Sequence, residues 1–255
     1  MTFSVEGLEV FMLILVRITA FIYVAPFFSL KNVPQKVKVG FSFFFAIILF
    51  QTMPTGTIEY QGVIGYASIV VSEALVGLII GFFTNISYYI LVLSGQLMDM
   101  EIGFSMVNEL DPTSNIQTTI TSNYYSNLII LMMLVTNLHH YLIIALADTF
   151  KIIPLGGANI RPSMYLLMLR FMKDYFIIGF RIVLPVFGTI LILNSILAIL
   201  AKVAPQMNMF VIGMQLKVFV GLIVLFLLAG STPIVSEFIF DEMIYMMKSA
   251  IDALM

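Results

Sequence analysis

The stretch VIGYASIVVSEALVGLIIGFFTNISYYILVL, residues 63–93, contains a single charged side chain, that of Glu73, among mostly apolar residues. It runs for about 31 residues, whereas a membrane-spanning α-helix needs about 17–25. A segment of this length and composition is expected to enter a bilayer and to be too long for one perpendicular crossing. The stretch therefore predicts a membrane protein with a bent or hairpin-like segment at this position.

The composition of the whole chain favours the same fold class. Of the 255 residues, 61% are hydrophobic and 10% are charged, and the mean hydropathy is +1.07. A soluble domain with so few charges could not cover its surface. Five further apolar runs, near or above the length of a span, cover residues 8–30, 37–53, 128–147, 175–201 and 209–229. Together they predict an all-α polytopic membrane protein with about five to seven membrane helices, built as one integral membrane domain over residues 1–255.

The basic residues conflict with a simple alternation of crossings. By the positive-inside rule, Lys31, Lys36 and Lys38 place the first loop in the cytoplasm, and the loop 51–62, without Lys or Arg, suits the opposite side. If every later run crossed once, the basic loop 151–173 would lie outside the cytoplasm, against the rule. A bent or hairpin segment within the opening stretch would remove the conflict.

Several charged residues lie within or beside the apolar runs. A charged side chain at mid-bilayer costs about 2.5–3.5 kcal/mol, so each is expected to face protein or water. These residues are Arg17, Glu73, Arg181, Lys202 and Lys217.

Two rows of residues recur at every fourth position and so share one face of a helix. The first row consists of Glu73, Gly77, Gly81 and Asn85, and the second of Gly213, Lys217 and Gly221. The glycines would let another helix approach closely. Two interpretations stay open: the rows are polar seams packed against other subunits or a wet lumen, or the charges pair within the chain, for instance Arg17 with Glu73.

One long polar segment interrupts the apolar chain: GFSMVNELDPTSNIQTTITSNYYS, residues 103–126. Asp111 and Pro112 favour a turn there, and the Asn, Ser and Thr residues prefer local hydrogen bonds to regular helix. Its apolar side chains, which a plain solvated loop would not need, are Phe104, Met106, Leu110 and Ile116. A membrane-surface loop with incidental apolar residues is the alternative interpretation.

No signature of an enzyme is found in the sequence. It lacks the zinc, hydrolase and phosphate-loop motifs. The adjacent His139 and His140 would point about 100° apart on a helix and could not chelate one ion from one face, and Asp99 and Glu101 fit a helix end or a solvated loop better than a catalytic pair. We therefore expect no catalytic site, metal or cofactor, and the net charge of −2 argues against binding to nucleic acid.

The chain resembles the FliR family of flagellar export-gate proteins and their counterparts in type III secretion injectisomes. Two positions depart from the family pattern: Gln215 stands in place of a usual proline, and Leu138 in place of a glycine before the histidine pair. The resemblance covers most of the chain and rests on Arg17 followed by APFFSLKNVPQKVKVGF (25–41), EALVGLIIG (73–81), SGQLMDMEIGFSMVNELDP (94–112), the pair His139 and His140, and VAPQMNMFVIGMQLKVFVGL (203–222).

The resemblance implies a fold of bent helical hairpins, similar to a fusion of FliP-like and FliQ-like folds, with N-terminal helices in 1–123 and C-terminal hairpins in 124–255. It implies a structural subunit of the gate through which unfolded proteins leave the bacterial cytoplasm, set in the cytoplasmic membrane at the flagellar basal body. The expected partners are FliP-like, FliQ-like, FlhB-like and FlhA-like proteins. In similar proteins the segment that matches 103–119 projects into the lumen as a plug, which suits its polar residues because irregular backbone at membrane depth must be buried or line a wet cavity.

Other function classes are weighed against this one. A multi-pass transporter of small molecules or ions would use the buried charges as a substrate site in an isolated chain, and saturable uptake would reveal it. An intramembrane enzyme would need a group that activates water, and the sequence shows none. Between a flagellar system and an injectisome, the flagellar one is favoured.

Overall fold

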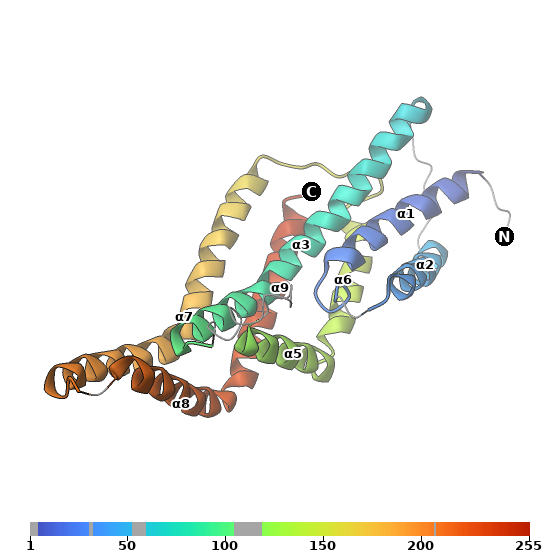
Figure 1. Cartoon of the computed structure of the whole chain (residues 1–255). Helices are drawn as coiled ribbons and strands as arrows, with labels where there is room; N and C mark the ends of the chain where they lie inside the picture. Colours follow the sequence, from blue (N-terminus) through green and yellow to red (C-terminus); the bar gives the residue numbers. More distant parts are fainter. Residues whose placement is uncertain (1–4, 31–32, 53–59, 105–118, 207) are drawn as a thin grey trace. The chain divides into compact units, whose positions relative to one another are not determined.

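The computed structural model describes residues 5–30, 33–52, 60–104, 119–206 and 208–255, and these form eight α-helices and no strand (Figure 1). The prediction of an all-α fold is confirmed. The helices are α1 (Val5–Val24), α2 (Gln35–Thr52), α3 (Gly62–Ile102), α5 (Ile120–Val135), α6 (Leu138–Ile152), α7 (Ser163–Val203), α8 (Met209–Ala229) and α9 (Thr232–Asp252).

Four of the described helices are long and apolar enough to cross a membrane: α1, α3, α7 and α8. The pair α5 and α6, which is bent at the two residues between them, can be counted as a fifth, broken span. The prediction of a polytopic membrane protein is confirmed. The predicted run 37–53 overlaps α2, which ends at Thr52 and is not among the helices long and apolar enough to cross a membrane.

The opening stretch lies inside α3, a single helix of 41 residues. Of the expected bent or hairpin segment, the hairpin is wrong, because the helix continues unbroken to Ile102. There Gly103 takes a left-handed φ of 96° and its amide donates to the carbonyl of Asp99 at 3.0 Å. An α-helix of this length runs about 60 Å along its axis, about twice the hydrocarbon thickness of a bilayer. The excess length noted in the sequence is therefore helix that continues past a single span.

Two helical stretches are missing from the prediction. The helix α7 begins at Ser163, before the predicted run 175–201. The prediction missed this first part because Arg170, Lys173 and Asp174 interrupt the apolar pattern. The helix α9 was not predicted, because its charged residues keep its hydropathy below that of a membrane span. Both are helices with charged faces, which a search for uniformly apolar runs passes over.

The chain divides into two compact units. The first consists of Met1–Ser87, Met133–Met172 and Phe240–Met255, and the second of Tyr88–Met132 and Lys173–Ile239. Each unit draws on residues from both sides of the predicted boundary between 123 and 124. That predicted division, like the single membrane domain, stays a prediction.

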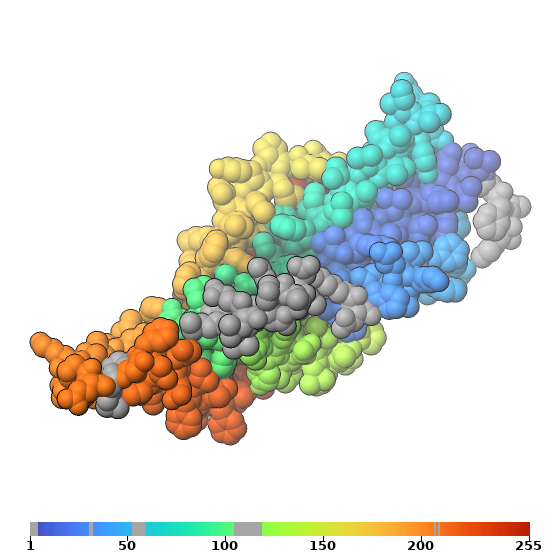
Figure 2. Space-filling model, in the orientation of Figure 1, coloured from blue at the N-terminus to red at the C-terminus, as the bar shows by residue number. Residues whose placement is uncertain are grey.

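In the first unit, α1 lies beside α2 and also packs against the N-terminal part of α3 (Figures 1 and 2). The contact with α3 is close because Gly77 and Gly81 have no side chain: a Cβ added at Gly77 would overlap the carbonyl oxygen of Arg17, and one at Gly81 would lie 3.1 Å from the carbonyl oxygen of Phe21. Asn85 extends this face, donating from Nδ2 to the carbonyl of Val24 at 2.6 Å. Thus Asn85 satisfies a carbonyl that the end of α1 leaves open.

The second unit uses small residues in the same way. A Cβ added at Gly95 of α3 would lie 2.5 Å from the Cα of Ser122 in α5, and the Ser122 hydroxyl donates to the carbonyl of Val92 at 2.6 Å. Between α3 and α7, Ser94 Oγ lies 3.1 Å from the carbonyl oxygen of Gly179, and it lies 2.8 Å from that of Ile90 in its own helix, so the two carbonyls share one hydroxyl donor. Hydrogen bonds from serine hydroxyls to backbone carbonyls of a neighbouring helix satisfy both groups where no water is present.

The close contact of α1 and α3 can be tested with Gly77→Ala. The added methyl group would meet the helical backbone of α1, which cannot move aside, so we expect a loss of about 1–3 kcal/mol of stability and a lower midpoint of thermal unfolding in detergent. Gly188→Ala is the matched control, since a Cβ there would meet nothing within 4 Å. Equal midpoints for the two variants would contradict the close contact.

Candidate functional site

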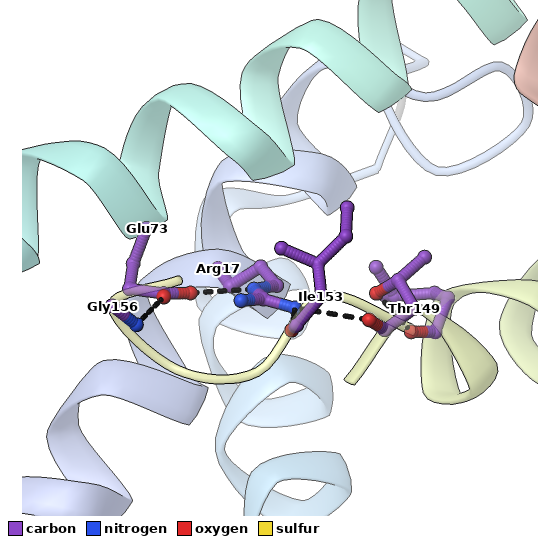
Figure 3. Close-up of polar contacts among 6 residues, drawn as sticks. Arg17, Glu73, Thr149, Ile153 and Gly156 are labelled. Carbon is purple, nitrogen blue, oxygen red and sulfur yellow. Dashed lines mark hydrogen bonds and ion pairs between the residues drawn. The ribbon is translucent and has the colours of Figure 1, made fainter. Parts of the chain in front are cut away.

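Arg17 forms a fully buried ion pair with Glu73. The Nε atom of Arg17, in α1, lies 2.5 Å from Oε2 of Glu73, in α3, and both side chains have 0% exposure (Figure 3). Of the two interpretations left open by the sequence, the structure shows pairing within the chain for these two residues. Burying an ion pair is unfavourable unless the remaining donors and acceptors are also bonded, so the other contacts of both side chains matter.

The remaining contacts of Arg17 come mainly from the end of α6, and its Nη2 is buried without a hydrogen-bond partner among the described residues. Its Nη1 donates to the carbonyl of Ile153 at 3.0 Å and, at a longer 3.4 Å, to that of Thr149. The Phe150 ring lies 4.3 Å from the guanidinium carbon, in the range of a cation–π contact. The last carbonyls of a helix have no partner within it and carry partial negative charge, so the end of α6 is a favourable neighbour for a cation.

Glu73 uses its second oxygen to hold the loop after α6. Its Oε1 accepts a hydrogen bond from the amide of Gly156 at 2.9 Å (Figure 3). Gly156 has a left-handed φ of 73° and a Cβ there would lie 3.4 Å from Ile69 Cγ2, so a glycine suits this turn. The ion pair therefore joins α1, α3 and the loop after α6 in the first unit.

The first predicted row therefore faces α1 along its whole length. Glu73, Gly77, Gly81 and Asn85 are all buried, and each contacts α1 or the residue that ends it. The sequence analysis did not predict that the loop after α6 would bind the ion pair of Arg17 and Glu73 as a third segment. Nothing in the spacing of Gly156 relates it to Glu73, which lies 83 positions away.

The other predicted charged residues lie in the second unit and are not brought to this ion pair. Arg181 and Lys202 are exposed on α7, and Lys217 is half-buried on α8. Among the described residues none of the three has a hydrogen bond or an ion pair. The glycines of the second row do pack closely: a Cβ at Gly221 would lie 2.7 Å from the Ile102 side chain, and one at Gly213 would lie 3.3 Å from that of Leu197.

Most of the predicted plug residues lie outside the described part of the chain. Phe104 is described and is half-buried. The residues that lie outside are Met106, Leu110, Asp111, Pro112 and Ile116.

The described residues on either side of this segment are joined by Asp99 and Thr121, both buried. One oxygen of the Asp99 carboxyl group accepts from the Thr121 amide at 3.0 Å, and the other accepts from the Thr121 hydroxyl. Asp99 thus caps the first turn of α5 from the last turns of α3, a capping role usually played by a residue next to the helix. The sequence predicted a helix end or a solvated loop for Asp99, and its complete burial fits only the helix end. Its partner Thr121 could not be predicted from the sequence.

The ion pair can be tested by removing one partner or both. Glu73→Leu leaves a buried guanidinium without its counter-ion, a cost of about 3–5 kcal/mol, so the yield of folded protein in membranes and its thermal midpoint should fall. Adding Arg17→Leu to it should restore part of the loss, because an apolar pair of similar volume leaves no buried charge.

The matched control for the ion pair is Lys151→Leu. It breaks the ion pair between Lys151 and Asp148, whose side chains are 76% and 48% exposed, respectively. An exposed pair contributes about 0–1 kcal/mol to stability, so the midpoint should change little. A double variant with a midpoint well below that of Glu73→Leu would contradict the coupling of the two charges.

The cap on α5 can be tested by hydrogen exchange. Asp99→Leu leaves the buried amide and hydroxyl of Thr121 without acceptors, which costs about 1–3 kcal/mol, so amide exchange at the start of α5 should be faster by roughly tenfold or more. Glu101→Leu, two residues further along α3 and only half-buried, is the control and should leave this exchange unchanged. Unchanged exchange in Asp99→Leu would show that the cap does not hold α5.

Comparison with known proteins places the chain in a family. Residues 8–243 match the family described as "Bacterial export proteins, family 1". Flagellar biosynthetic protein FliR of Bacillus subtilis (strain 168) is 30% identical over 245 residues, which are 94% of this chain and 93% of that protein. The protein of the same name from Escherichia coli (strain K12) is 27% identical over 243 residues, 94% of this chain and 92% of that protein. The chain therefore belongs to the FliR family of bacterial export proteins, which its motifs predicted.

Proposed function

We propose that the chain is a structural subunit of the bacterial flagellar type III protein-export apparatus and helps form the channel for unfolded substrates. The observation that carries the proposal is the match over nearly the full length to proteins named flagellar biosynthetic protein FliR. The match spans the same helices that can cross a membrane. We further propose the cytoplasmic membrane, at the flagellar basal body, as its location.

The surface of the spanning helices supports a role within a larger assembly. In α3 and in α7, only 22% of an apolar 18-residue stretch is buried within the chain, and in α8 only 11%. Lipid or other protein must cover the rest, since such apolar surface is not stable in water. FliP-like and FliQ-like subunits, with FlhB-like and FlhA-like components, are the partners that we propose for it.

No energy source or chemistry is assigned to this chain. The one buried ion pair among the described residues is bonded to backbone groups on both sides. It therefore holds helices together, whereas an enzyme would need polar groups that can react with a substrate. The same bonding disfavours a small-molecule or ion transporter, because such a protein would offer its buried charges to a substrate. Energy for export would come from partner proteins.

A plug role for the segment 103–119 stays a prediction from the resemblance. It is supported by the helical residues at its two ends, because the cap of Thr121 by Asp99 fixes where the chain leaves α3 and where it enters α5.

The proposed function is tested by purifying the tagged full-length chain from native membranes and identifying what co-purifies. We expect small helical membrane proteins of the flagellar export apparatus in one large complex, and loss of swimming and of filament-protein export when the gene is deleted. Complementation with the wild-type gene or Gly188→Ala should restore both, whereas Glu73→Leu should restore them poorly. A stable monomer with saturable uptake of a small molecule, or normal export after deletion, would refute the proposal.

A further inference from the structure

The second compact unit contains an open cavity of about 330 Å³. Its walls come from α5, from α7, and from the segment where α8 ends and α9 begins. Apolar side chains make most of the lining, for instance Ile178, Pro185 and Phe238, and Arg181 is the only charged lining residue. A cation at the mouth of an apolar cavity is suited to a ligand with an anionic head and an apolar tail.

The position of the cavity along the helices matches a membrane boundary. Arg181 and Lys202 flank the apolar segment 182–201 of α7, which is about 30 Å long as an α-helix and equals the hydrocarbon thickness of a bilayer. The helix α8 returns beside α7 (Figure 1) and ends where Leu228 and Ser231 line the cavity. The cavity lies at one end of this hairpin, and if the segment 182–201 spans the bilayer, that end is at the level of the lipid headgroups.

The polar groups of the cavity favour an anion. Arg181 is exposed and has no hydrogen bond or ion pair among the described residues. Two of the lining hydroxyls already donate to backbone carbonyls, Ser231 to Leu228 at 2.7 Å and Thr232 to Ala229 at 2.8 Å. The guanidinium is the charged donor left, and the Tyr125 side chain adds a third hydroxyl to the lining. The planar fork of N–H groups in the guanidinium matches the oxygens of a phosphate.

An anionic phospholipid has both features that match this lining, a phosphate for the Arg181 guanidinium and acyl chains for the apolar wall. We propose that the cavity binds an anionic glycerophospholipid, with the phosphate on Arg181 and part of an acyl chain along the apolar wall towards Pro185.

The chain has no tryptophan, so a single introduced one can report on this cavity. Phe238→Trp places it in the lining, and the full-length protein is reconstituted in vesicles that contain brominated phosphatidylglycerol or brominated phosphatidylcholine, which quench nearby tryptophan. We expect phosphatidylglycerol to bind about fivefold more strongly than phosphatidylcholine, the effect of one basic residue beside an anionic lipid. Arg181→Gln should remove this preference, and Arg181→Lys should keep most of it.

Two controls separate this site from general lipid contact. Phe219→Trp, on an exposed position of α8 outside the cavity lining, should be quenched equally by both lipids. Lys202→Gln, at the other end of the same apolar segment, should leave the preference at Phe238→Trp unchanged.

Three results would overturn the proposal. The first is equal quenching of Phe238→Trp by the two lipids, and the second is a preference that survives in Arg181→Gln. The third is protection of the reporter from both lipids in complexes purified from membranes, which would show that a protein partner covers the cavity. Inorganic phosphate should not compete with phosphatidylglycerol, because it lacks the acyl chain, and effective competition would reassign the site to a free anion.

Discussion

Hydrocarbon cannot solvate a guanidinium, so the charge of Arg17 has to be met by groups that the chain itself supplies. Glu73 provides the counter-charge and the last turn of α6 provides the carbonyls. Because these groups come from three separate segments, a shift of any one of them would break a hydrogen bond of the buried pair. The first compact unit owes its arrangement of α1, α3 and α6 to this requirement more than to apolar packing, which is not directional.

The ion pair in turn requires two helices to lie unusually close. Gly77 and Gly81 follow Glu73 on the same face of α3 and bring its backbone against that of α1. The Glu73 carboxylate can then reach Arg17 across the narrow gap between the helices. Small residues at a helix crossing and a polar pair beside them act together here, as is common where no hydrophobic effect drives helices together.

Sequence reasoning recovered the parts of this structure that depend on local spacing. The every-fourth-residue row from Glu73 to Asn85 indicated one face of a helix, and pairing of Arg17 with Glu73 was one of the two interpretations left open. Contacts with Gly156 and between Asp99 and Thr121 join residues that no period relates, so they could not be predicted. The expected hairpin in 63–93 was wrong because length alone does not distinguish a chain that turns back from a helix that continues past the bilayer.

The distance along the chain between Arg17 and its partners has a consequence for synthesis. Glu73 follows Arg17 by 56 residues and Thr149 follows it by 132, and a bacterial ribosome adds about 5–20 residues per second. The first helix therefore emerges several seconds before its counter-ion and longer still before its carbonyl partners. During that interval the guanidinium has to stay near water or the insertion machinery, so α1 can settle at its final depth only after α3 has been made.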